Sequence, residues 1–166
     1  MQAWSVVFSV TGASAATLLG LLFVAVSIHS GALGSMHQNS RLMAEQAFQN
    51  YLLVMLVSLL ALFPSLSLAE LGYATLGLTA LRSVWAMLRM YRAALQPYGG
   101  TSRLHSLRRL FSSLLGFALL IAASARMVRG SGDPRTMFAS AILILLFSAT
   151  IVAWELLLRI AAEKRA

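Results

Sequence analysis

The sequence predicts an all-α, polytopic transmembrane helical bundle of five spans, with the N-terminus outside and the C-terminus in the cytoplasm. Three observations lead to this fold class. Hydrophobic residues make up 59% of the 166-residue chain, against about 45–50% in soluble domains, and the mean hydropathy is +0.80. The apolar residues fall into five runs, and a helix needs about 20 such residues to cross a bilayer. Basic residues gather near the ends of these runs.

Each apolar run is expected to be a helix, because backbone inside a bilayer must satisfy its own hydrogen bonds. The expected spans are 4–28, 44–63, 66–90, 107–127 and 136–160. Only Pro64 and Ser65 separate the second span from the third, which predicts a tight helical hairpin. The segment Gly130–Pro134 has the composition of a turn and separates the last two spans. Residues 1–166 are expected to form a single transmembrane domain.

The first run is interpreted as a retained span. Met1–Trp4 carries no basic residue, and the apolar stretch continues to Ile28, beyond the about 7–15 residues of a signal-peptide core. A bundle of four spans is the alternative, in which the first run lies flat on the membrane.

The distribution of lysine and arginine predicts the orientation, because cytoplasmic loops carry an excess of both. An N-out/C-in arrangement places three basic residues outside, namely Arg126, Arg129 and Arg135. It places the others on the cytoplasmic side: Arg41, Arg82, Arg89, Arg92, Arg103, Arg108, Arg109, Arg159, Lys164 and Arg165. The formal net charge of +8 therefore indicates contact with anionic lipid headgroups, and no nucleic-acid partner is expected.

No enzyme signature stands out, so no catalytic, cofactor-binding or metal-binding residue is proposed from the sequence and the chain is not expected to be an enzyme. The chain has no cysteine, which excludes disulfides, thiol nucleophiles and cysteine metal ligands. The three histidines His29, His37 and His105 follow no zinc-binding spacing. They are interpreted as loop residues in contact with headgroups.

Small residues recur every four positions in the first span, at Gly12, Ala16 and Gly20. Such a stripe lets another helix approach closely. The stripe is therefore a predicted helix-packing face. It serves either contacts within the same bundle or association with a second protein.

The third span carries a polar face formed by Thr75, Thr79 and Arg82, together with Gly72 at one end. An ionisable residue inside a span usually faces the bundle interior or a wet cavity, and marks a functional site. The face therefore predicts either a wet lining or, at Arg82, a side chain that extends to the cytoplasmic headgroups.

Glu155 in the last span lies at nearly the same depth as Arg82, which suggests an ion pair between the two, because an unpaired charge in hydrocarbon is expensive. Arg159, one turn further along, competes for Glu155. A cytoplasmic polar ring is also expected, and it is formed by His29, Gln46, Gln49, Asn50 and Arg159. The ring could line a vestibule or bind a headgroup, or it could be an ordinary interfacial belt.

Two segments resemble a family of small bacterial integral membrane proteins of unknown function. Residues 12–29 look like the first helix of that family, and residues 56–64 are similar to its second helix. Some members are labelled as modulators of a membrane AAA protease. The resemblance implies a multi-pass protein of the bacterial cytoplasmic (inner) membrane, and it supplies no catalytic residues.

Two functions are consistent with these features. One is a homo-oligomeric channel or small-solute conduit lined by the polar face of the third span. The alternative is a non-transporting partner or regulatory protein that binds another membrane protein, or anionic lipid, through the first span and the basic loop after the third. No cofactor is expected for either.

Overall fold

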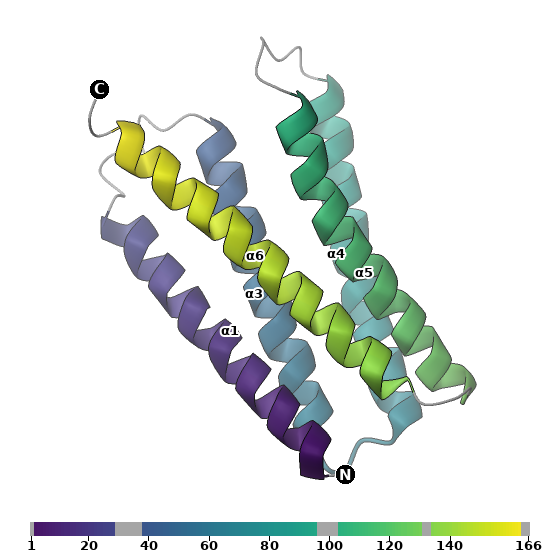
Figure 1. Cartoon of the computed structure of the whole chain (residues 1–166). Coiled ribbons are helices and arrows are strands. Elements are labelled where there is room, and N and C mark those ends of the chain that lie inside the picture. Colours follow the sequence, from purple (N-terminus) through teal and green to yellow (C-terminus); the bar gives the residue numbers. More distant parts are fainter. Residues whose placement is uncertain (1, 29–37, 96–102, 131–133, 164–166) are drawn as a thin grey trace. The chain divides into compact units, whose positions relative to one another are not determined.

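A computed structural model of the chain describes residues 2–28, 38–95, 103–130 and 134–163, and the described part is all-helical. Its five helices are α1 (Gln2–Ile28), α3 (Gln38–Leu62), α4 (Leu68–Leu95), α5 (Arg103–Arg129) and α6 (Arg135–Glu163) (Figure 1). The predicted all-α class is therefore confirmed. Most of the helices extend beyond the apolar runs, because a helix continues through the interface after its hydrophobic stretch has ended.

Three helical stretches among the described residues are long and apolar enough to cross a membrane. They are Trp4–Ile28, Met43–Leu62 and Arg135–Leu158, judged by length and composition. These stretches belong to α1, α3 and α6 and are compatible with a membrane location. The spans expected in α4 and α5 stay predictions.

The chain divides into two compact units, and each is described by itself. Unit 1 comprises residues 1–62 and 143–166, and unit 2 comprises residues 63–142. Unit 1 therefore contains α1, α3 and most of α6, while unit 2 contains α4, α5 and the first residues of α6.

The core of unit 1 joins its three helices, and Tyr51 is its largest fully buried side chain. The buried members are Leu22, Met43, Ala47, Tyr51, Ala149, Val152 and Leu156, each no more than 5% exposed. The Tyr51 hydroxyl donates a hydrogen bond to Thr150 Oγ1 at 3.2 Å, and Thr150 Oγ1 donates in turn to the carbonyl of Leu146 at 2.9 Å. The phenol thus fills the apolar core of the unit while its polar end is satisfied.

Close contact between α1 and α3 depends on a glycine. The two helices run antiparallel (Figure 1), and a Cβ added at Gly12 would lie 3.1 Å from Cβ of Ser58. Beside it, Thr11 Oγ1 and Ser58 Oγ lie 3.3 Å apart, both side chains being buried. Small and hydroxyl residues allow such an approach in a membrane helix pair and stabilise it with a hydrogen bond.

A capping box begins α4 in unit 2. The backbone N–H of Ser67 donates to Glu70 Oε2 at 2.8 Å, and the N–H of Glu70 donates to Ser67 Oγ at 3.2 Å. The two reciprocal bonds satisfy N–H groups that a helix start leaves without partners. Together with Pro64, they fix where the chain turns from α3 into α4.

The helices α4 and α5 pack as an antiparallel pair with a glycine at their contact (Figure 1). A Cβ added at Gly72 would lie 3.0 Å from Cβ of Met127, from the carbonyl oxygen of Ser124 and from Cγ2 of Val128. Only a residue without a side chain fits there. Close to this contact, Gly130 follows the last turn of α5 with a φ of 65°, the left-handed conformation that glycine adopts without strain.

Candidate functional site

The polar face predicted on the third span lies on α4 and points mostly into the protein. Thr75 and Thr79 are completely buried, at 0% exposure, and Arg82 is half-buried. The two threonines of this face therefore lie in the protein interior, and Arg82 is partly accessible.

Thr75 uses its hydroxyl to bind α5. Thr75 Oγ1 lies 2.8 Å from Ser124 Oγ and 2.8 Å from the carbonyl oxygen of Leu71. Since each hydroxyl has one hydrogen, Ser124 can donate to Thr75 while Thr75 donates to Leu71. The contact is a buried interhelical hydrogen bond, one turn from the glycine contact at Gly72.

Thr79 differs from the hydroxyl residues one turn before and after it. Ser83 Oγ donates to the carbonyl of Thr79 at 2.8 Å, and Thr75 bonds the carbonyl of Leu71. Thr79 Oγ1, in contrast, is buried and has no hydrogen-bond partner among the described residues. Buried hydroxyl groups are almost always paired, so this atom requires an explanation.

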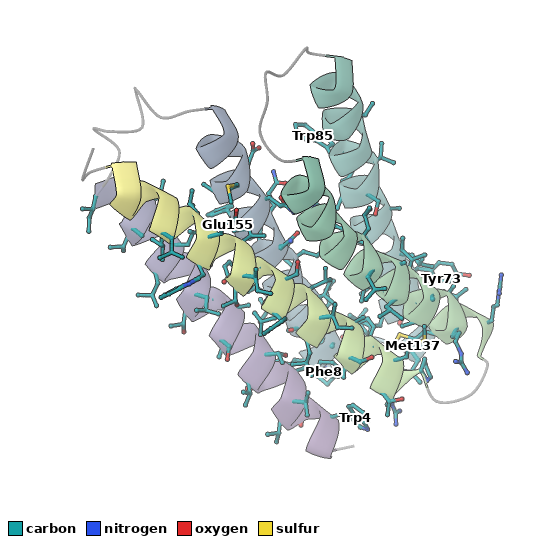
Figure 2. The ribbon with its side chains drawn as sticks, turned by 45° about the horizontal axis from the view of Figure 1, so that its top comes forward. Trp4, Phe8, Tyr73, Trp85, Met137 and Glu155 are labelled. Atoms are coloured by element: carbon teal, nitrogen blue, oxygen red, sulfur yellow. The ribbon has the colours of Figure 1, made fainter. Side chains whose placement is uncertain are left out.

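Several large apolar side chains of α4 and α6 are exposed, and some hydroxyl side chains of both helices are buried. On α4, Leu81, Val84 and Trp85 are between 54% and 64% exposed. On α6, Phe147 is 68% and Trp154 64% exposed. Figure 2 shows the side chains of Tyr73 and Trp85 on α4. Exposed apolar side chains of this size and number are compatible with a membrane location.

The predicted stripe Gly12, Ala16 and Gly20 does not form one surface in α1. Gly12 is buried against α3, whereas Ala16 and Gly20 are exposed and a Cβ at Gly20 would meet nothing within 4 Å. The side of α1 that faces its own unit is instead formed by Phe8, Thr11, Gly12, Ala15 and Leu22.

The exposed side of α1 carries its own small residues. Ala13, Ala16, Thr17 and Gly20 are all exposed and lie within about 100° of arc; we name them the α1 small face. The Thr17 hydroxyl donates to the carbonyl of Ala13 at 2.9 Å, so its polar group is satisfied within the helix.

At the start of α1, Trp4 stacks on Phe8 with centroids 6.4 Å apart (Figure 2).

The predicted cytoplasmic ring is described only in part. Asn50 is buried, while Gln46 and Gln49 are half-buried and Gln49 donates to Glu45 at 3.2 Å. His29 and the side chain of Arg159 lie outside the described residues. Arg82 belongs to unit 2 and the half-buried Glu155 of α6 to unit 1, and their ion pair stays a prediction.

Two of these side-chain contacts could not be predicted from the sequence. Tyr51 and Thr150 are 99 residues apart in the chain, and Thr75 and Ser124 are 49 apart. The two residues of each pair belong to different helices, so the pairings depend on how the helices pack. Among the described residues, no group of three His, Asp or Glu side chains could hold a metal ion; the side chains of all three histidines lie outside that part of the chain.

The chain matches no protein-family model, no curated protein and no solved structure. The family resemblance of its first two predicted spans therefore stays a prediction. Function has to be inferred from the geometry of the two units.

Proposed function

We propose that this chain is a non-enzymatic integral membrane protein whose role is to bind another membrane-embedded helix through the α1 small face. The observation that carries the proposal is the exposure of Ala13, Ala16, Thr17 and Gly20 on a helix apolar enough to span a membrane. Between helices in lipid, close backbone approach replaces the hydrophobic effect as the source of affinity. The first partner that we propose is a second copy of the chain.

The burial of α1 is consistent with this role. In the most apolar 18-residue stretch of α1, 28% of the residues are buried within the protein. The corresponding share is 39% in α3 and in α6. The small residues recur four apart, as Ala13 with Thr17 and Ala16 with Gly20, which is the spacing of close helix pairs. Contact with lipid chains alone would not require small residues at these positions, because leucine contacts lipid equally well.

The membrane setting is proposed with five spans, N-out and C-in, in a bacterial inner membrane. The pattern of exposed apolar and buried hydroxyl side chains on α4 supports a membrane position for α4 as well as for α1, α3 and α6. The orientation rests on the basic residues near the span ends. The basic loop after α4 lies outside the described residues, so its contact with anionic lipid stays a prediction.

The first test is the oligomeric state in lipid nanodiscs, measured by native mass spectrometry. We expect a defined oligomer for the wild type and loss of at least tenfold in association for Gly20→Leu, because leucine would separate the two backbones. Gly77→Leu is the matched control, since a Cβ at Gly77 also meets nothing within 4 Å. A wild type that is monomeric, or variants that associate equally well, would rule out this face as the contact.

A homo-oligomeric conduit is the second candidate, and the orphaned hydroxyl of Thr79 favours it. A conduit would use Thr79 and Arg82, because Thr75 is already bound to Ser124. Small-solute entry into proteoliposomes should then fall at least tenfold in Arg82→Ala. Absence of solute entry in the wild type would leave only the partner role.

A further inference from the structure

Thr79 lies at the middle of α4. It is eleven residues from Leu68, about 16 Å along a helix of about 42 Å. Its side chain is 0% exposed, and in the part of the chain that the structure describes its Oγ1 has no hydrogen-bond partner. An unpaired hydroxyl at this depth is unfavourable, because surrounding lipid and apolar side chains offer nothing in exchange for water.

Polar groups lie one turn away in both directions along α4. The Thr75–Ser124 hydroxyl pair is on one side, with Thr75 and Ser124 both at 0% exposure. The half-buried Arg82 is on the other side. Each of the two hydroxyls has acceptor capacity beyond the bond between them. A water molecule needs about two to four polar partners to be held inside a protein, and unit 2 carries polar side chains on the turns of α4 next to Thr79.

We propose that the interior of unit 2 is hydrated at Thr79, with a water molecule bound to its hydroxyl. The water is reached along the α4 face from the side of Arg82, the nearest position on that face that is not fully buried. The site is a specific water site in the middle of a span. It goes beyond the partner role of α1, and it stands whether or not the chain forms a conduit.

The test is water-edited solid-state NMR on the full chain in bilayers, which measures magnetisation transfer from water to each side chain. We expect transfer to Thr79 at least threefold faster than to Ala123, an apolar residue of unit 2 with 0% exposure. Thr11 is the hydroxyl control, because it is buried and bonded to Ser58. A Thr79 hydroxyl that instead turned to bond its own helix would show the slow transfer of Thr11 and overturn the proposal.

The variant Thr79→Val separates a bound water from general wetness. Valine keeps the shape of threonine and removes the hydroxyl, so transfer to residue 79 should fall to the level of Ala123. Unchanged transfer in Thr79→Val would show that the hydroxyl does not hold the water, and would equally overturn the proposal. Neither result depends on association through α1, which the nanodisc measurement tests.

Discussion

Replacing Gly72 by leucine should separate α4 from α5 and destabilise unit 2 more than any other single change on α4. An added Cβ would lie 3.0 Å from three atoms, one of them the backbone carbonyl oxygen of Ser124. A side chain can move aside, whereas a helix backbone cannot without displacing the whole helix. We expect a loss of about 3 kcal/mol or more, at the upper end of overpacking effects, measured as the free energy of unfolding in bicelles.

Gly77→Leu is the matched control for this variant, because Gly77 belongs to the same helix and its added Cβ would meet nothing within 4 Å. It should change the free energy of unfolding by no more than about 0.5 kcal/mol, as is usual for a surface position. Equal losses in the two variants would mean that α4 and α5 do not meet at Gly72.

Replacing Tyr51 by alanine should have the largest effect in unit 1. The ring is 1% exposed at the centre of a core that joins α1, α3 and α6. Its removal leaves a cavity between three helices and ends the hydrogen bond to Thr150. In soluble cores such changes cost about 3–5 kcal/mol. In a bilayer the loss of packing contacts still lowers stability, whereas the hydrophobic contribution is small. We therefore expect Tyr51→Ala to lower the free energy of unfolding by about 2–3 kcal/mol.

Two controls divide this effect into its parts. Tyr51→Phe keeps the ring and removes only the hydroxyl, so it should cost about 0.5–1.5 kcal/mol. Phe48→Ala removes an aromatic ring from the same helix at a position that is 38% exposed, and should cost less than Tyr51→Ala. If Phe48→Ala proved the more harmful in thermal unfolding, the core of unit 1 would be centred elsewhere.

The helices of this fold are predictable from sequence because their cause is local. Backbone inside a bilayer has to satisfy its own hydrogen bonds in a helix, and each of the five runs is helical over most of its length in the structure. Their ends are less predictable: α4 continues to Leu95, and α5 begins at Arg103, because helix propensity carries on where hydrophobicity stops. Composition alone identifies α1, α3 and α6 as possible spans.

The candidate site was predictable in its residues but not in its contacts. A spacing of 100° per residue places Thr75, Thr79 and Arg82 on one face, yet it cannot say that Ser124 covers Thr75. The stripe at Gly12, Ala16 and Gly20 shows the same limit. Its spacing is compatible with one packing face, but it cannot say that Gly12 contacts α3 while Gly20 is exposed.

Hydroxyl residues have a common role in the two units. In unit 1, Thr11 and Ser58 join α1 to α3, and in unit 2, Thr75 and Ser124 join α4 to α5. In each helix pair a glycine lies within one turn of the threonine, at Gly12 or Gly72. The small residues at these two contacts are therefore buried, whereas those of the α1 small face are exposed.

The most direct measurement is disulfide crosslinking of single-cysteine variants in lipid bilayers, for which a chain without cysteine is already suited. Cysteines would be placed at Ala13, Ala16, Thr17 and Gly20, with Phe147, which is 68% exposed on α6, as the lipid-facing control. We expect covalent dimers from the α1 small face, strongest where the helices cross, and none from Phe147. Dimers that form equally at Phe147, or at none of the four α1 positions, would contradict the proposed role of α1.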